Sequence, residues 1–150
     1  MIRQLQKNEE IPYKLLLLAD ETIEAINRYI NDSEIFIFEN DNETIGVYVL
    51  QKISDDTIEI KNIAVDTKHQ GRGIGKLLLR DASLRAKAKG FKTIVIGTGD
   101  IATKQLRLYQ KEGFEIFGLK KGFYTDNYPN PIYENGVQLK DMVMLKKELV

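Results

Sequence analysis

The chain alternates between short apolar runs and longer stretches in which apolar residues recur every three or four positions. Short apolar runs bounded by Asn, Asp or Ser predict strands, and the three-to-four spacing predicts helices. The predicted strands span residues 2–6, 35–38, 44–53, 57–65, 93–96, 114–119 and 142–145. The predicted helices span residues 13–18, 21–30, 74–89 and 102–112.

Turn residues and connection lengths predict how these strands pair. Two turns rich in Asn, Asp and Ser separate the three strands between residues 35 and 65, which should therefore be antiparallel. The helix over 74–89 links the strand 57–65 to the strand 93–96. A helical connection of this kind makes its two strands parallel.

Two of the helices have a predictable buried face. Asp20 is a candidate N-cap for the second helix, with Ile23, Ile26 and Ile30 facing the core. For the helix 74–89, the apolar side is expected to contain Ile74, Leu77, Leu78, Ala82, Leu84 and Ala88.

The segment 123–136 is long, aromatic and acidic, and it contains two of the three prolines. Long loops in small domains are often functional lids, and this composition can enclose a cationic amine. A β-hairpin loop or a dimer contact remains an equal alternative.

Composition narrows the class of protein. With 150 residues, 43% hydrophobic and 29% charged, residues 1–150 are expected to form one compact domain. The absence of cysteine excludes disulfides, thiolate zinc sites and a cysteinyl acyl intermediate. The N-terminus lacks the apolar region of a signal peptide, so we expect a cytoplasmic protein with no membrane partner.

The charges are unevenly distributed although the net charge is zero. Residues 1–65 carry 6 basic and 13 acidic side chains, whereas residues 66–92 carry 8 basic and 2 acidic ones. The basic segment suits a polyanionic cofactor and the acidic half suits a cationic acceptor, although solvated surface charge is the better explanation for any single residue. Nucleic acid is not an expected partner of a chain without net positive charge.

The glycine-rich stretch 70–76 joins the strand 57–65 to the following helix. Its sequence, Gln-Gly-Arg-Gly-Ile-Gly-Lys, brings free helix N-terminal amides close to a bound anion, so a phosphate site is expected. It is not a Walker loop, because Gln70 stands where the first glycine belongs and Leu77 where a hydroxyl is needed. It is not a dinucleotide fingerprint either, because Lys76 replaces the third glycine.

Two motifs together resemble the GCN5-related N-acetyltransferase (GNAT) family, as a small stand-alone bacterial-type member. The first is Gln70-Gly71-Arg72-Gly73-Ile74-Gly75, which is similar to the family's acetyl-coenzyme A loop. The second is Tyr109-Gln110-Lys111-Glu112-Gly113-Phe114 on the next helix. The resemblance covers about residues 34–119; a purely structural glycine turn is the alternative.

The resemblance implies an α+β fold with three layers. Its mixed central sheet has about six or seven strands, with antiparallel N-terminal strands, and about four helices. One parallel pair, strands 4 and 5, is splayed to hold the cofactor. The resemblance also allows a homodimer formed through the last strands.

The same resemblance implies which residues bind acetyl-CoA, without any metal. The backbone of Ile63 and Val65 would pair with the pantetheine arm, and the Val65 amide would stabilise the oxyanion. The remaining cofactor candidates are Gln70, Gly71, Arg72, Gly73, Gly75, Lys76, Thr98 and Tyr109.

Two side chains are the catalytic candidates besides the Val65 amide. Glu59 matches the glutamate of the histone-acetylating branch and would accept the amine proton; the alternative is an exposed carboxylate paired with a lysine. Tyr109 would donate to the departing thiolate; the alternative is a core aromatic.

The chain departs from the family pattern on the helix 102–112. Ala102 stands where Asn often contacts the pantetheine arm, and Gln105 where a small residue is common. That contact could move to Thr98, Asp100 or Thr103. His69, the only histidine, has no obvious partner in the sequence and is left out of the site.

The sequence therefore predicts an N-acetyltransferase that transfers acetyl directly to a small cationic amine. A polyamine, an aminoglycoside-like compound and an amino-acid derivative all fit that description. An enzyme acting on protein N-termini or lysines is the alternative. A non-catalytic coenzyme A sensor is a third possibility, favoured slightly by Ala102.

Overall fold

The computed structural model describes residues 1–150 and contains a seven-stranded sheet, a two-stranded hairpin and five α-helices. The strands are β1 (Ile2–Gln4), β2 (Glu34–Asn40), β3 (Glu43–Lys52), β4 (Thr57–Val65), β5 (Thr93–Gly99), β6 (Glu115–Lys120), β7 (Ile132–Glu134), β8 (Val137–Leu139) and β9 (Met142–Glu148). The α-helices are α1 (Tyr13–Leu16), α2 (Ile23–Asn27), α3 (Ile74–Ala88), α4 (Thr103–Lys111) and α5 (Phe123–Asn127). Two 3₁₀ helices, η1 (Ile30–Asp32) and η2 (Thr67–His69), complete the set.

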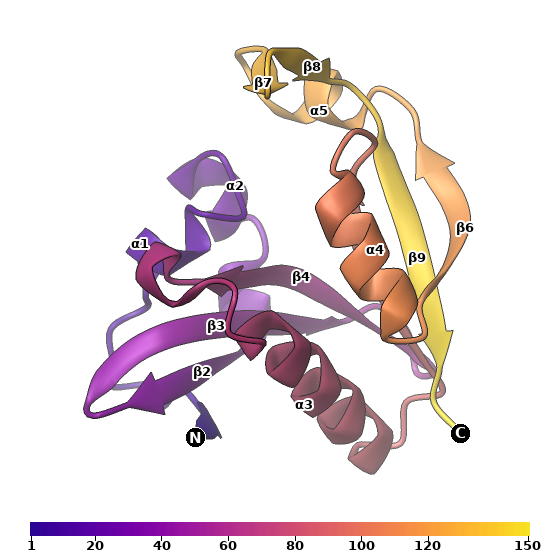
Figure 1. The fold of residues 1–150 in the computed structure, drawn as a ribbon. Helices are drawn as coiled ribbons and strands as arrows, with labels where there is room; N and C mark the ends of the chain where they lie inside the picture. The colour runs from indigo at the N-terminus through magenta and orange to yellow at the C-terminus, as the bar shows by residue number, and fades with distance from the viewer.

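The large sheet has the strand order β1-β2-β3-β4-β5-β9-β6 (Figure 1). All neighbours are antiparallel except β4 and β5, which are parallel. The predicted mixed sheet with a single parallel pair is therefore confirmed. The sequence did not predict α5, which lies inside the aromatic segment 123–136; the hairpin β7–β8 begins in that segment, for which a β-hairpin loop was one alternative.

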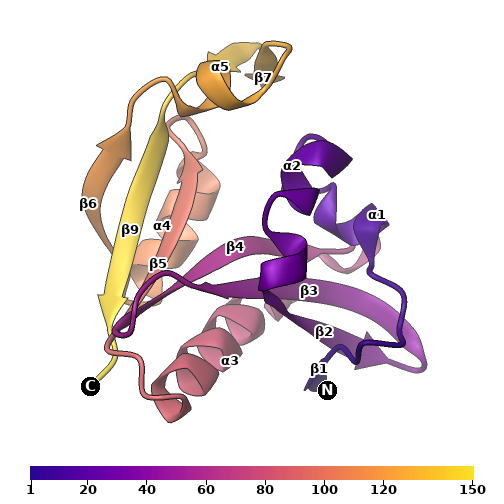
Figure 2. The same ribbon diagram turned by 180° about the vertical axis from the view of Figure 1, so that it is seen from behind.

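Helices cover both faces of the β2–β4 part of the sheet. Helix α3 packs on one face, and α1 and α2 on the other, as the front and rear views show (Figures 1 and 2). The two faces bury separate apolar clusters, and the continuous apolar run Ile35–Phe38 supplies both: Phe36 packs toward α3, and Ile35 and Ile37 toward α1 and α2. A strand buried on both faces needs such a run.

Strands β4 and β5 are paired only over their first halves. The paired residues run from Thr57 opposite Thr93 to Ile60 opposite Ile96. Beyond that point β4 stays with β3 and β5 stays with β9, so the sheet divides into two diverging arms (Figure 1). The expected splay is confirmed, and it leaves backbone groups in the second half of β4 without a neighbour on that side.

A β-bulge interrupts β4 at Lys61. Val49 of β3 lies opposite Asn62, and Leu50 lies opposite Ile60, so Lys61 has no partner residue. One extra residue reverses which side chains face which side of a strand. Consequently Ile60 packs in the α3 cluster, whereas Ala64 packs in the α1 and α2 cluster.

The predicted buried face of α3 was correct in part. Leu77, Leu84 and Ala88 are exposed, the two leucines by 47% and 68%, whereas Leu79 and Ala86 are buried. Gly46 of β3 lets the helix come close to the sheet: an added Cβ there would lie 3.2 Å from Leu78 Cδ1. No helix is both long enough and apolar enough to span a bilayer.

The predicted cap of α2 was wrong. Thr22, not Asp20, caps this helix, with its Oγ1 accepting a hydrogen bond from the Ala25 amide at 3.0 Å. Ile26 and Ile30 are buried as expected, but Ile23 is 45% exposed. Asp20 lies two residues before this cap and lines the cavity described below.

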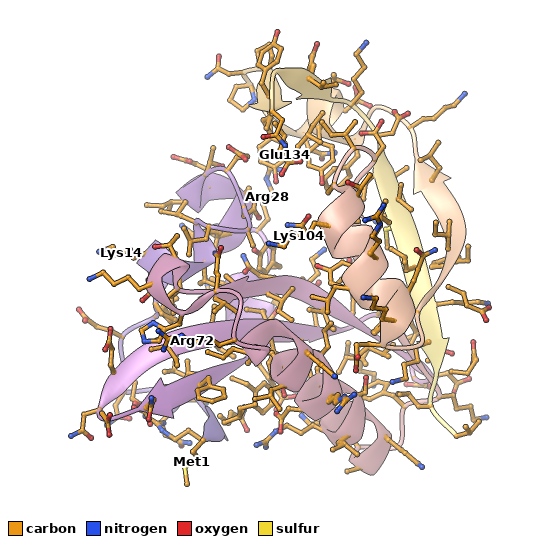
Figure 3. All side chains as sticks on the ribbon, in the orientation of Figure 1. Met1, Lys14, Arg28, Arg72, Lys104 and Glu134 are labelled. Carbon is orange, nitrogen blue, oxygen red and sulfur yellow. The ribbon has the colours of Figure 1, made fainter.

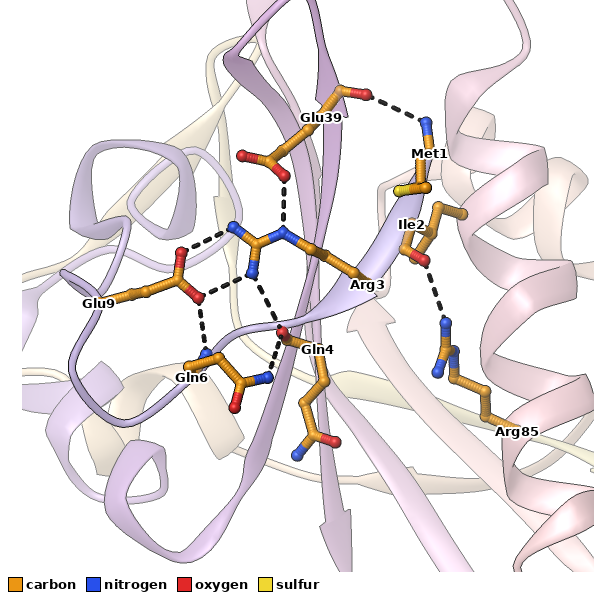
Figure 4. Close-up of polar contacts among 8 residues, drawn as sticks. All are labelled: Met1, Ile2, Arg3, Gln4, Gln6, Glu9, Glu39 and Arg85. Atoms are coloured by element: carbon orange, nitrogen blue, oxygen red, sulfur yellow. Dashed lines mark hydrogen bonds and ion pairs between the residues drawn. The ribbon is translucent and has the colours of Figure 1, made fainter.

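The N-terminal strand is held by Arg3 (Figure 4). Its guanidinium donates to the Glu9 carboxylate at 2.7 and 2.6 Å and to Glu39 at 2.6 Å. These bonds lower the pKa of Glu9 to about 2 and lower that of Glu39. Arg3 therefore joins β1, β2 and the connection to α1.

Candidate active site

A cavity of about 1060 Å³ lies where β4 and β5 separate. Its walls come from the glycine loop, the second half of β4, the end of β5, helix α4, the connection between α1 and α2, and the segment 123–136. Nearly all the candidate site residues line it: Glu59, Ile63, Val65, Gln70, Gly71, Gly73, Gly75, Lys76, Thr98 and Tyr109.

Arg72 is the one candidate that does not line this cavity. Its side chain lies at the β2–β3 side of the glycine loop, whereas Arg28 and Lys104 border the opening between α2 and α4 (Figure 3). If Arg72 contributes to cofactor binding, its backbone amide is the group available. The positively charged side chains of α3 and α4 that do line the cavity are those of Lys76, Arg80, Lys104 and Lys111.

The glycine loop presents a row of free amides. None of the backbone amides from Gln70 to Lys76 donates a hydrogen bond within the chain, and the first helical bond runs from Leu77 to the Gly73 carbonyl. Gly71 and Gly73 have φ of +80° and +79°, which side-chain-bearing residues rarely adopt. Free amides at the start of a 15-residue helix suit a phosphate group.

The Gln70 side chain fixes the loop to the preceding strand. Its Nε2 donates to the Val65 carbonyl at 3.1 Å. His69 also lines the cavity, and its Nδ1 lies 3.0 Å from the Asp66 carboxylate. This partner was not predicted, although the spacing of three residues between Asp66 and His69 in a helical turn is a signal for it.

Tyr109 extends from α4 into the cavity and is only 6% exposed. Its hydroxyl has no hydrogen-bond partner in the protein, and it is not among the fully enclosed polar atoms, so it borders the cavity. Burial raises the pKa of Tyr109 to about 12. The hydroxyl is therefore a proton donor throughout the neutral and mildly alkaline range.

Glu59 lines the same cavity from β4 and is 8% exposed. Its Oε2 lies 3.7 Å from the Lys61 ammonium, which lies 5.5 Å from the centre of the Tyr29 ring. The alternative predicted for Glu59 was an exposed carboxylate paired with a lysine. The lysine is present, but the carboxylate is buried.

A hydrogen-bonded chain that sequence reasoning missed borders the α1–α2 side of the cavity. Asn62 Nδ2 donates to the Leu16 carbonyl at 3.0 Å and to the Tyr29 hydroxyl at 3.1 Å. Tyr29 donates to Asp20 at 3.1 Å, and Tyr128 donates to the other oxygen of Asp20. Burial raises the pKa of both tyrosines, so both remain donors.

The aromatic segment encloses this end of the cavity. The rings of Tyr124 and Tyr128 are stacked with centres 6.0 Å apart, and Phe123 meets Tyr124 edge-on at 5.1 Å. The hairpin β7–β8 agrees with one of the alternatives predicted for this segment. The Tyr128–Asp20 hydrogen bond in addition holds part of the segment over the cavity as a roof. Figure 3 shows Glu134 from the hairpin facing Arg28 across the opening.

The substituted positions of α4 also border the cavity. Ala102, where the family often has Asn, is buried there together with Gln105. Of the three proposed replacements for that Asn, only Thr98 lines the cavity. No three His, Asp or Glu side chains come together as a metal-binding group.

The family is shown by comparison with known proteins. A family model described as an acetyltransferase (GNAT) domain matches residues 31–116. The chain belongs to the GNAT family. The resemblance carried by the glycine loop and Tyr109 is thereby confirmed.

Individual relatives are similar to this chain in sequence over nearly its whole length. The uncharacterized N-acetyltransferase YvbK of Bacillus subtilis (strain 168) is 43% identical over 144 residues, which are 96% of this chain and 92% of YvbK. A GNAT family acetyltransferase from Elizabethkingia anophelis, solved with acetyl-CoA bound, has a TM-score of 0.97 and 49% identity, covering 99% of this chain and 97% of its own. A Bacillus subtilis acetyltransferase solved with CoA has a TM-score of 0.92 and 41% identity, covering 99% and 98%. The GNAT chain described here is accordingly an N-acetyltransferase.

Proposed function

We propose that this enzyme transfers an acetyl group from acetyl-CoA directly to a primary amine of a small cationic molecule. The observation that carries the proposal is the composition of one cavity. The free amides of the glycine loop, the buried Tyr109 and the buried Glu59 all border it. A donor for a leaving group and an acceptor for an amine proton thus face the same space.

The cofactor half of the proposal rests on the loop and on the splay. The diphosphate of acetyl-CoA binds the amides between Gln70 and Lys76, where the helix dipole adds to the attraction. The pantetheine arm runs between β4 and β5, where the Ile63 and Val65 backbone is free of a β5 partner. The amide groups of this arm pair with β4 like an added strand.

The chemical half assigns a role to three groups. An alkylammonium loses a proton to Glu59 and the free amine attacks the thioester carbonyl, forming a tetrahedral intermediate whose oxyanion is held by the Val65 amide. The carbon–sulfur bond then breaks, and the Tyr109 hydroxyl gives its proton to the departing thiolate. The amide nitrogen sheds its extra proton, which restores the Tyr109 hydroxyl. No acyl-enzyme is formed, which agrees with the absence of cysteine.

The acceptor class follows from the other end of the cavity. Asp20, Glu21 and Glu134 border it together with the rings of Tyr29, Phe123, Tyr124 and Tyr128. Carboxylates and aromatic ring faces both attract an ammonium group. The Tyr128–Asp20 bond closes this end from above, which favours a small molecule over a protein segment that needs an open groove.

Initial-rate kinetics with a polyamine test direct transfer. Acetyl-CoA and amine are varied together, and intersecting double-reciprocal lines are expected because both substrates must be bound before reaction. Parallel lines would indicate an acyl-enzyme and contradict the proposal. Acetylated amine, identified by mass spectrometry, must form in equal amount to free coenzyme A.

A further inference from the structure

Lys61 has an unusual position for a cation in this cavity. As the bulged residue of β4 it lacks a partner in β3, and its side chain enters the cavity beside Glu59. Its side chain is 26% exposed, and that of Glu59 is 11% exposed. Glu59 has no other ion-pair partner in the protein.

The surroundings of the Lys61 ammonium are those that a bound alkylammonium would need. A carboxylate oxygen of Glu59 lies 3.7 Å from it, and the centre of the Tyr29 ring lies 5.5 Å from it. Tyr29 itself is held by Asn62 and Asp20, so its ring is fixed in place. A carboxylate and a rigid ring face form a subsite for one positive charge.

We propose that Glu59 and Tyr29 form the ammonium subsite of the acceptor, and that Lys61 is its built-in occupant. This inference rests on the proposed function and deepens it. An acceptor cation displaces the Lys61 ammonium before its own nitrogen reaches Glu59. Lys61 is thereby a specificity-determining residue: it weakens the binding of simple monocations, whereas an acceptor with further cationic groups gains contacts with Asp20, Glu21 or Glu134.

Binding of tetramethylammonium tests the subsite apart from catalysis, because this ion has no N–H and cannot be acetylated. Its dissociation constant is measured by calorimetry with the wild-type enzyme, Lys61→Met and Lys61→Gln. Both variants should bind it about fivefold more tightly or better, because they remove a like charge at contact distance. Using two uncharged variants guards against the misfolding of one, and thermal unfolding checks both.

Lys120→Met is the matched control. Lys120 also lines the cavity, and its ammonium also lies over an aromatic ring, 5.7 Å from the centre of Phe123, but it has no carboxylate partner. Its removal should leave tetramethylammonium binding unchanged, and adding Glu59→Gln to Lys61→Met should abolish the gain. Equal tightening in Lys120→Met, or no tightening in either Lys61 variant, would overturn the inference. Tightening without turnover of any amine would refute the proposed function and leave the subsite standing.

Discussion

The hydroxyl of Tyr128 donates a hydrogen bond to the carboxylate of Asp20, which lies 108 residues earlier in the chain. This bond joins the C-terminal aromatic segment to the connection between α1 and α2, on opposite sides of the cavity (Figure 3). The other oxygen of Asp20 accepts from Tyr29, which is also part of the proposed ammonium subsite. The roof and the acceptor subsite therefore share one carboxylate.

Replacing Tyr128 by Phe should weaken acceptor binding. Loss of the bond to a charged group frees the roof, so KM for the amine should rise about five- to tenfold while KM for acetyl-CoA stays the same. The expected loss of unfolding free energy is about 1 kcal/mol. Steady-state kinetics and denaturant unfolding measure both quantities.

Tyr133→Phe provides the control for that experiment. Tyr133 belongs to the same segment but is 64% exposed and makes no hydrogen bond through its hydroxyl. Its kinetics should match those of the wild type. Equal effects of the two substitutions would mean that the Tyr128–Asp20 bond has no special part in acceptor binding.

Glu59→Gln should lower turnover, and the loss should be largest at low pH. A base is needed most where nearly all of the amine is protonated, and it is needed less as free amine accumulates toward pH 10. We expect a loss of about 100-fold near pH 6.5 that shrinks toward pH 9.5. Rate profiles of both enzymes measure it; a ratio that is constant with pH would exclude Glu59 as the base.

Gly73→Ala should weaken acetyl-CoA binding. Its φ of +79° strains any residue with a Cβ, so the loop must change shape and its amides move away from the diphosphate. We expect the dissociation constant for acetyl-CoA to rise about tenfold, measured by calorimetry. Gly136→Ala is matched to it, since Gly136 has φ of +78° and lies in the β7–β8 turn. That variant should bear a similar strain and bind acetyl-CoA normally; weakened binding in both variants would contradict the assignment.

The parts of the site that the sequence predicted are those determined by local chemistry. Glycine at positions 71 and 73 permits the tight turn with positive φ that the loop adopts, and the helical connection through α3 makes β4 and β5 parallel. The Lys61 bulge was not predicted, although the sequence carries a signal for it. The apolar positions of β4 that pack toward α3 are Ile58 and Ile60 before Lys61 and Ile63 and Val65 after it, which is the shift that one extra residue produces. The Tyr128–Asp20 bond could not be predicted, because residues so far apart in sequence are brought together only by the whole fold.

The ion pairs of Arg3 with Glu9 and Glu39 should make the stability of the fold decrease as the pH falls in the acidic range. The pKa of Glu9 is lowered to about 2, so its contribution is complete above its ordinary value of 4.5 and is lost as the pH falls toward 2. Glu39, whose pKa is also lowered, changes stability in the same direction. Thermal unfolding from pH 7 to pH 2.5 should show a smaller fall in Tm for Arg3→Gln than for the wild type.

The exposed pair of Lys52 and Asp55, 3.2 Å apart, supplies the control for that series. Asp55 is 99% exposed, and such pairs contribute little to stability. Lys52→Gln should therefore follow the wild-type curve. If Arg3→Gln also follows it, the ion pairs of Arg3 have no role in the acid sensitivity.

The central claim is that this GNAT enzyme acetylates a small cationic amine with Tyr109 as the proton donor. The most direct test is the release of free thiol from acetyl-CoA across a panel of polyamines, aminoglycosides, amino-acid derivatives and peptides, with the wild type and Tyr109→Phe. We predict turnover on at least one small cationic amine, reduced about 100-fold or more by Tyr109→Phe with acetyl-CoA affinity unchanged. Turnover on peptides alone, binding of acetyl-CoA without any turnover, or full activity of Tyr109→Phe would contradict the account.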